Sequence, residues 1–251
     1  MEVTPERIRE VEKKAKRIRR ETLELAMKHK EGHLGPSFSI VEILVSLYEE
    51  ILKEEDKFIL SKGHGSLSLY AVLRSKGFNP KVATHPDIDR EQGIECTTGS
   101  LGHGLPMSVG MALAKKMKGK RGRVFVLMGD GECQEGTTWE SMLVASHHKL
   151  DNLTVIVDHN KIQALDRIEN VLSFNSLAEK FRCFGAHVIE VDGHSIEELI
   201  NAFNTEVKGR PKVIIAHTVK GKGLSFAENN PVWHSRLPTQ KQYLQALKEL
   251  E

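Results

Sequence analysis

Short apolar runs alternate along this chain with stretches in which apolar residues recur every three or four positions. The runs Val124–Met128 and Leu153–Val157 are typical of strands buried on both faces of a sheet. Between them the pattern predicts a helix over roughly Thr137–Lys149. A strand–helix–strand unit of this kind is nearly always right-handed and returns the second strand parallel to the first. The two strands should therefore end at the same edge of one sheet.

The rest of the chain continues this alternation. Further strands are predicted at Phe58–Leu60, His187–Val191 and Val213–Thr218. Helices are predicted from Thr4-Pro5 through Leu25, from Ser37 or Ser39 to Ile51, after Ser66 through Leu73, and over Ser108–Lys118, Leu177–Phe184, Ser195–Val207 and Gln240–Leu250. Loops are predicted at Glu31–Pro36, at Gly77–Leu105 and from Asn160 to Asn175. Together these elements predict an α/β fold: a single domain over residues 1–251, with a mostly parallel sheet covered by helices on both faces.

Composition narrows the class of protein. Of the 251 residues, 39% are hydrophobic and 28% charged, which is ordinary for a soluble globular domain. The net charge of +2 gives no argument for nucleic acid as a partner, and no run approaches the roughly eighteen apolar residues that span a membrane. The three cysteines have no metal-binding spacing and an odd count. A cytoplasmic location is therefore expected.

The predicted first helix carries a basic cluster, Lys13–Arg20. Its apolar residues, among them Val11, Ala15 and Ile18, form a narrow stripe that suits a surface helix. A solvated charged face is the ordinary interpretation of such a cluster. Nucleic-acid binding and a contact with another subunit remain as alternatives.

Candidate chemistry appears where the two central strands end. Gly129-Asp130-Gly131-Glu132 follows the first strand, and Val157-Asp158-His159-Asn160 closes the second. Each segment alone is typical of a turn. At neighbouring strand ends, however, one carboxylate and one amide oxygen suit a magnesium ion that holds a diphosphate, and glycines let the backbone approach it. Because open α/β sheets bind ligands at this edge, the pair points to a thiamine diphosphate enzyme.

Further segments extend this likeness in order along the chain. They are Gly32-His33-Leu34-Gly35-Pro36, Ser61-Lys62-Gly63-His64-Gly65-Ser66, His85-Pro86-Asp87, Thr98-Gly99-Ser100-Leu101-Gly102-His103-Gly104, Glu135-Gly136, Lys149-Leu150-Asp151-Asn152-Leu153, Glu190-Val191-Asp192-Gly193-His194, Lys220-Gly221-Lys222-Gly223 and Trp233-His234. With them the sequence resembles transketolase from about residue 8 to residue 243. The likeness is to the diphosphate-binding half alone, so the chain resembles the N-terminal subunit of a split transketolase.

The resemblance implies a function that needs a second chain. In the family, thiamine diphosphate and Mg²⁺ support transfer of a two-carbon ketol unit from a ketose phosphate to an aldose phosphate. The pyrimidine-binding half and most sugar-phosphate contacts would come from a C-terminal partner subunit. By analogy with the transketolase dimer, a heterotetramer with two copies of each subunit is expected.

The resemblance also implies site residues. Those expected to act in catalysis are His33, His64, His85, His234 and Glu135. Those expected to bind the cofactor are His64, Gly99, Leu101, Gly129, Asp130, Gly131, Glu132, Asn160, Ile162 and Lys222. Those expected to bind the metal are Asp130, Asn160 and, through its carbonyl, Ile162.

Two departures from the family pattern bear on the substrate. His103 stands where transketolases commonly have glutamine, and Gln163–Arg167 replaces the usual sequence after the metal-binding asparagine. Two alternatives to transketolase stay open. One is another thiamine diphosphate reaction, as in deoxyxylulose phosphate synthase or a 2-oxo-acid dehydrogenase, although His33 and His85 suit a hydroxylated donor better. The other is a cofactor-binding protein without catalytic activity.

Overall fold

Five parallel strands form one sheet in the computed structural model, which describes residues 3–251. The strands are β1 (Lys57–Leu60), β2 (Val124–Gly129), β3 (Leu153–His159), β4 (His187–Asp192) and β5 (Lys212–His217). Their order across the sheet is β1-β2-β3-β5-β4, and every pairing is parallel. The predicted α/β class is confirmed, and the strand predictions match to within a few residues. Residues 1–2, where the predicted domain begins, lie outside the described part.

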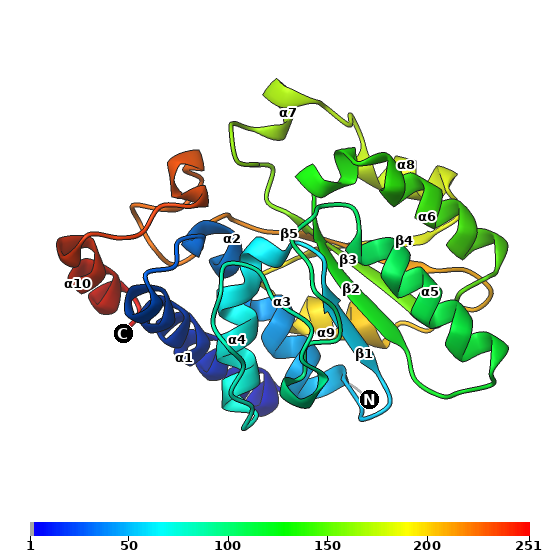
Figure 1. The fold of residues 1–251 in the computed structure, drawn as a ribbon, viewed down its shortest axis with the longest axis horizontal. Helices are drawn as coiled ribbons and strands as arrows, with labels where there is room; N and C mark the ends of the chain where they lie inside the picture. The colour runs from blue at the N-terminus through cyan, green and yellow to red at the C-terminus, as the bar shows by residue number, and fades with distance from the viewer. Residues whose placement is uncertain (1–2) are drawn as a thin grey trace.

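Helices connect the strands and extend the fold at both ends (Figure 1). They are α1 (Pro5–His29), α2 (Leu34–Phe38), α3 (Val41–Ser46), α4 (Ser66–Ser75), α5 (Gly104–Met117), α6 (Gly136–His147), α7 (Ile168–Val171), α8 (Leu177–Cys183), α9 (Ile196–Asn204) and α10 (Gln240–Glu249). Short turns of other helix types are η1 (Leu47–Ile51), η2 (Gly63–Gly65), η3 (Arg90–Gln92), η4 (Gly131–Gln134) and η5 (Pro231–His234). None of the helices within residues 3–251 is long and apolar enough to cross a membrane.

Alternate residues of each strand supply two hydrophobic cores, one on each face of the sheet. Phe125 and Leu127 of β2 pack into a cluster with residues of α1, α3, α4 and α9. Val124 and Val126 of the same strand face the other way, into a cluster with residues of α5, α6 and α8. Figure 1 shows these two sets of helices on opposite sides of the sheet. The predicted cover on both faces is therefore confirmed.

The first loop and the second helix differ from the prediction. The segment expected as a loop at Glu31–Pro36 becomes helical at Leu34. Pro36 is compatible with this helix because a proline in the first helical turn removes no intrahelical hydrogen bond. Neither Ser37 nor Ser39 caps the next helix: α3 begins after Ile40 without a side-chain cap. The hydroxyl of Ser39 instead donates to the carboxylate of Asp158, 2.7 Å away. Tertiary contact thus outweighs the local capping signal.

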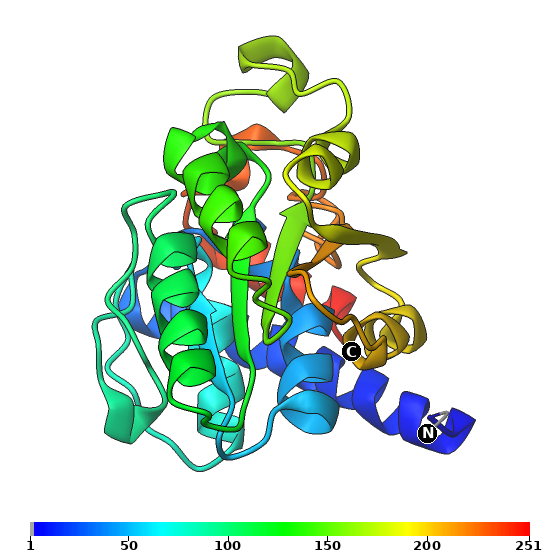
Figure 2. The same cartoon turned by 90° about the vertical axis from the view of Figure 1, so that its right-hand side faces the viewer.

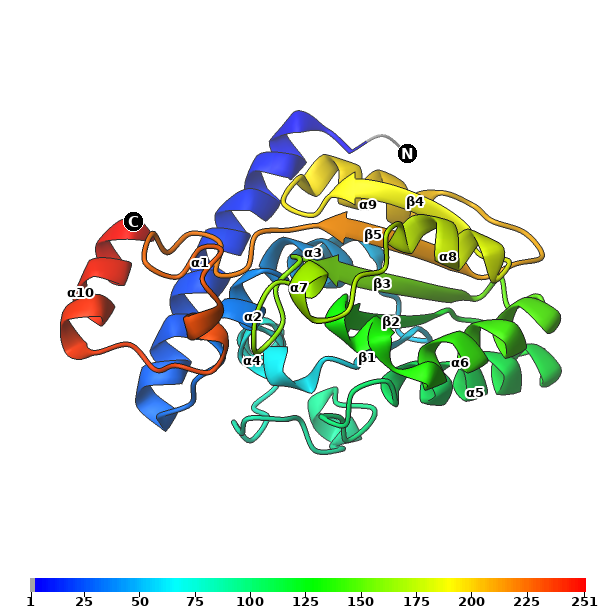
Figure 3. The same ribbon diagram turned by 90° about the horizontal axis from the view of Figure 1, so that it is seen from above.

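Two further segments lie at the periphery of the molecule. The stretch between β3 and α8, expected as a loop, includes the short helix α7 and projects beyond the end of β3 (Figure 2). The second segment, α10, packs beside α1, on the side of the molecule away from α5 and α6 (Figure 3).

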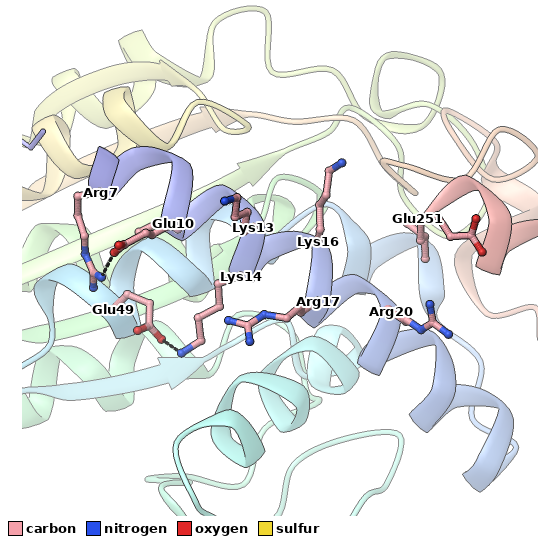
Figure 4. A pocket seen from close by; sticks show the side chains of 11 residues that line it. Arg7, Glu10, Lys13, Lys14, Lys16, Arg17, Arg20, Glu49 and Glu251 are labelled. Carbon is pink, nitrogen blue, oxygen red and sulfur yellow. Dashed lines mark hydrogen bonds and ion pairs between the residues drawn. The ribbon is translucent and has the colours of Figure 1, made fainter. Parts of the chain in front are cut away.

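A surface hollow of about 770 Å³ runs along α1. Its basic residues come from the cluster predicted on the first helix, with Arg7 in addition (Figure 4). Lys14 pairs with Glu49 of η1, whereas Lys13, Lys16 and Arg17 are exposed to solvent. These contacts match the interpretation of a solvated charged face.

Candidate functional site

A cavity of about 230 Å³ lies at the carboxyl edge of the sheet. It gathers residues from segments far apart in the sequence, most of them predicted site residues. Its predicted members are His33, His64, His85, Gly99, Leu101, Gly129, Asp130, Gly131, Glu132, Asn160, Ile162 and His234. Its remaining lining residues are Pro36, Lys62, Gln163, Ala164 and Lys220. Of the predicted set, only Glu135 and Lys222 lie outside the lining.

Asp130 and the segment after Asn160 meet directly at this edge. The backbone N–H groups of Gly131 and Lys161 donate to the two Asp130 carboxylate oxygens, at 2.8 and 2.6 Å. The side chain of Asp130 is buried, and none of the ion pairs among residues 3–251 includes it. Burial, together with the nearby charge of Asp158, raises the pKa of Asp130 to about 7. A buried carboxylate of this kind is stabilised as an anion by a cation in the cavity.

Asp158 anchors the floor of the cavity. Its fully buried carboxylate pairs with the Lys62 ammonium at 2.5 Å and accepts from the Asn160 amide at 2.9 Å. Ser39 and Thr218 also donate to it. Although burial opposes ionisation, the Lys62 charge and these hydrogen bonds hold the pKa of Asp158 below its usual value. The bond to Asp158 orients the Asn160 side chain, whose oxygen accepts from Ile162 N–H at 3.1 Å.

These oxygen donors fit a magnesium ion with a diphosphate. Within residues 3–251, no group of three or more His, Cys, Asp or Glu residues is placed to hold a metal. A cation at Asp130 would take its other ligands from neutral oxygens, such as those of Asn160 and Ile162, and from a bound anion. The Ile162 carbonyl accepts from Lys220 Nζ at 2.9 Å in this structure. Such a donor set contains only oxygen atoms and carries one negative charge, that of Asp130. It would leave coordination positions on the metal for phosphate oxygens.

Four histidines form one wall of the cavity. The ring centre of His33 lies 6.1 Å from that of His64, 6.4 Å from that of His85 and 5.5 Å from that of His234. The rings of His64 and His234 stack at 5.1 Å. The backbone of His33 is in the left-handed region, with φ +63°, immediately before α2.

Burial and positive neighbours keep the imidazoles of His33, His64 and His234 neutral. Burial lowers the pKa of His33, and the His85 ring lowers it further. Burial and then the Lys62 charge hold the pKa of His64 well below its ordinary value. Burial and the Lys220 charge lower the pKa of His234 to about 3. Neutral imidazoles can either accept or donate a proton, so this wall can bind hydroxyl groups and move protons.

Lys220, rather than Lys222, reaches the cavity. Its Nζ lies 2.8 Å from His234 Nδ1, and burial followed by the Lys62 charge lowers its pKa to about 7. The chain turns at Gly221, φ +77°, so the backbone carbonyl of Lys222 accepts instead from Arg19 on α1. Of the two lysines in the Lys-Gly-Lys-Gly segment, the one predicted to bind the cofactor therefore lies outside the cavity lining.

Glu135 and Glu132 have different surroundings. Glu135 is exposed at the start of α6, outside the cavity, and its side chain makes no capping bond. Glu132 is buried and accepts from Ser61 and from the N–H groups of Gly102 and Gly129, at 2.8 and 3.1 Å. Glu132 therefore joins the loop before α5 to the end of β2.

Gly99 provides close approach at the cavity. At φ +139°, a Cβ there would lie 2.9 Å from the His85 ring, so glycine is needed. His103 is exposed and does not line the cavity; its Nδ1 lies 3.1 Å from the Leu101 carbonyl oxygen. Of the segment Gln163–Arg167, which departs from the family pattern, Gln163 and Ala164 border the cavity.

Sequence reasoning missed Lys62, Asp158 and Lys220. All three lie inside segments that carried the resemblance, so their signal was present. In these segments the neighbouring histidine and asparagine indicate site chemistry more directly than the lysines or the aspartate do. Only the fold shows that Lys62 and Asp158 form a buried pair.

Comparison with known proteins identifies the family. The model of the family described as transketolase, thiamine diphosphate binding domain, matches residues 11–248. The chain belongs to the transketolase family. The fold agrees: the transketolase of Leishmania mexicana superposes with a TM-score of 0.88 at 28% identity, over 96% of this chain and 41% of that one. The chain thus spans about two fifths of the solved transketolases that it matches.

Relatives of two lengths match this transketolase-family chain. It is 40% identical to a protein of Actinobacillus succinogenes named as one subunit of apulose-4-phosphate transketolase, over 96% of each protein. It is 37% identical to the 6-deoxy-6-sulfo-D-fructose transketolase subunit SqwG of a Clostridium species, over 93% of this chain and 94% of that one. Human transketolase is 35% identical over 88% of this chain but only 39% of its own length.

Proposed function

We propose that this chain is the diphosphate-binding subunit of a two-subunit transketolase. With its partner it transfers a two-carbon ketol unit between sugar phosphates, using thiamine diphosphate and Mg²⁺. The observation that carries the proposal is the meeting of Asp130, Asn160 and four histidines in one cavity at the sheet edge. A site that bound only a diphosphate would need Asp130 and Asn160 but not the four histidines.

Each group of residues has a defined part in this proposal. Asp130, Asn160 and the Ile162 carbonyl hold the metal, and the backbone at Gly99 and Gly131 lets the cofactor approach. When bound, thiamine diphosphate supplies a nucleophilic carbon and an electron sink for cleavage of a carbon–carbon bond. The protein's own residues do the remaining work.

The histidine wall handles the donor sugar. His33 and His85 bind its hydroxyl groups, and His64 and His234 stay neutral beside Lys62 and Lys220. A neutral imidazole accepts the proton of the hydroxyl next to the breaking bond and returns one to the product. Acyl transfer from pyruvate requires no such hydroxyl contacts, so this wall favours ketol transfer.

The relatives support a partner and a substrate class. Three relatives of matching length are named as subunits, which supports assembly with a second chain that carries the pyrimidine-binding half. Their named substrates are an apulose phosphate and a sulfonated fructose, so an anionic ketose is the substrate class proposed here. The same proposal includes a heterotetramer with two copies of each subunit and a cytoplasmic location. In that assembly, the exposed Glu135 would lie at the contact between subunits.

A reconstitution assay tests the proposal. The chain, a candidate C-terminal partner subunit and the mixture of both are each supplied with thiamine diphosphate, Mg²⁺, xylulose 5-phosphate and ribose 5-phosphate. We expect ketol transfer only from the mixture. Transfer by this chain alone would refute the two-subunit hypothesis. Activity of the mixture with pyruvate but with no ketose would favour the rival acyl-transfer reaction.

A further inference from the structure

The turn Val219–Gly223 carries Lys220 into the cavity, and two contacts hold this turn from outside. Near its start, the Val219 N–H donates to His194 Nε2 at 2.8 Å. Near its end, the Lys222 carbonyl accepts from Arg19 Nε at 3.1 Å. Neither His194 nor Arg19 lines the cavity. Lys220 therefore sits between two points that are fixed by residues of other elements.

One buried carboxylate joins the two supports. Glu42 of α3 pairs with Arg19 of α1 through both carboxylate oxygens, at 2.5 and 2.6 Å. Its second oxygen also lies 3.0 Å from His194 Nδ1. Burial alone would raise the pKa of Glu42, but the His194 hydrogen bond and the Arg19 charge lower it to about 2. The carboxylate is thus ionised at neutral pH and holds both supports at once.

These contacts fix the state of the His194 ring. Since the Val219 N–H donates to Nε2, that nitrogen has no proton, and Nδ1 carries the proton that it donates to Glu42. The ring can serve both neighbours only as this neutral tautomer. Its backbone is held as well: the His194 N–H donates to Asp192, and a Cβ at Gly193 would lie 2.4 Å from Thr218 Cγ2.

We propose that Glu42, His194 and Arg19 are positioning residues that hold the turn Val219–Gly223, and so fix Lys220 against His234 and Ile162. The consequence for cofactor binding rests on the function proposed above. The positioning itself is a property of this chain and needs no cofactor. Loss of the His194 contact should free Lys220 while leaving Lys62, which is held by Asp158, in place.

Labelling of lysines in the full chain tests this directly. Lys62 and Lys220 are both 1% exposed, so each serves as a reference for the other. His194→Asn keeps a donor near Glu42 but loses the acceptor for Val219, whereas His194→Gln can place an oxygen near the Nε2 position. Each protein is treated with an amine-reactive reagent, and labelling of the two lysines is followed by peptide mass spectrometry.

We expect His194→Asn to label Lys220 roughly tenfold faster than the parent, as for loss of one buried hydrogen bond. His194→Gln should restore most of the protection, and Lys62 should label at the parental rate in both variants. Unchanged Lys220 labelling in His194→Asn would overturn the proposal. So would an equal rise at Lys62, because that rise would show a general loss of structure.

Calorimetry of thiamine diphosphate with Mg²⁺ on the assembled enzyme separates this proposal from the proposed function. We expect His194→Asn to weaken binding and His194→Gln to restore it. Parental affinity in His194→Asn would overturn the consequence for cofactor binding. If the parent enzyme binds no thiamine diphosphate, the proposed function fails, whereas the lysine labelling still decides the positioning role.

Discussion

Two buried aspartates at the sheet edge differ in how their charges are balanced. Asp158 is neutralised by Lys62, but Asp130 accepts only backbone hydrogen bonds and has a pKa of about 7. An uncompensated buried carboxylate lowers the stability of a fold unless it gains a cation. The buried charge of Asp130 therefore costs the fold stability, which is the cost expected of the metal ligand proposed above.

Replacing Asp130 should separate binding from folding. We expect Asp130→Asn to weaken magnesium-dependent binding of thiamine diphosphate to the assembled enzyme by more than roughly a hundredfold, since a charged ligand is lost. The unfolding free energy of the chain without cofactor should not fall, because the buried charge is removed. Calorimetry and denaturant unfolding measure the two quantities. The exposed Glu169→Gln is the control, and unchanged cofactor affinity in Asp130→Asn would exclude Asp130 as a ligand.

His85 should act on turnover rather than on cofactor binding. It is exposed at the cavity mouth, and its ring lies 6.4 Å from that of His33. We expect His85→Ala to lower kcat roughly a hundredfold or more, as for loss of a group that moves or orients a proton. Thiamine diphosphate affinity should stay the same, and His29→Ala, outside the cavity, should change neither. A defect confined to cofactor affinity would contradict a role with the substrate.

At the residue scale, the sequence was informative where residue type alone limits the chemistry. Asp130 and Asn160 could be selected because strand ends and oxygen donors together limit what they can do. Lys62 and Lys220 could not, since a lysine in a glycine-rich segment is ordinarily a solvated surface residue. Their burial depends on Asp158 and on the Ile162 carbonyl, which only the folded chain brings to them.

At the scale of elements, α1 and α3 are joined to the turn after β5 through Glu42. This contact explains why Arg19 is buried on a helix whose other basic residues are exposed or half-buried. Helix periodicity predicted α1 well, but its positive cluster concealed the one arginine that points inward. Similarly, periodicity does not predict that η1 follows α3 as a π-helical turn. It also does not predict that Ser39 donates to Asp158 instead of capping a helix.

The Glu42 contact predicts a dependence of stability on pH. The pKa of Glu42 is about 2 in the folded chain and near 4.5 ordinarily, so between these values the unfolded chain binds the extra proton. The ionised Glu42 therefore contributes about 3 kcal/mol to the free energy of unfolding. This contribution is complete above pH 4.5 and is lost as the pH falls toward 2. We expect Glu42→Gln to be less stable than the parent at pH 7 and to approach it at low pH.

Denaturant unfolding of both proteins from pH 7 to pH 3 measures this difference. Glu10→Gln, which removes an exposed carboxylate on α1, is the control and should change stability by less than about 0.5 kcal/mol. A gap between Glu42→Gln and the parent that stays constant over the whole range would contradict the assigned pKa.

At the scale of the whole molecule, the site is complete only when distant segments converge. His33, His64, His85 and His234 come from four separate stretches, and residues 77–103 have too little periodicity to be placed from sequence. The layered fold followed from strand and helix patterns, whereas the histidine wall was expected only from the resemblance. What local patterns cannot supply is the tertiary path of the connecting loops.

The projecting segment around α7 predicts where the partner subunit binds. Leu165 and Leu172 there are 85% and 58% exposed, and Leu143 on neighbouring α6 is 59% exposed. Exposed apolar side chains on a segment that begins at the cavity residues Gln163 and Ala164 suit an interface with the proposed partner. We expect Leu165→Asp with Leu172→Asp to weaken association with the partner at least roughly tenfold, measured by sedimentation, since two leucines that the interface would bury are lost. Leu244→Asp is the matched control: Leu244 is 53% exposed and lies on α10, which is well separated from α7 in Figure 1. Circular dichroism of both variants should match the parent, and equal loss of association in the control would place the interface elsewhere.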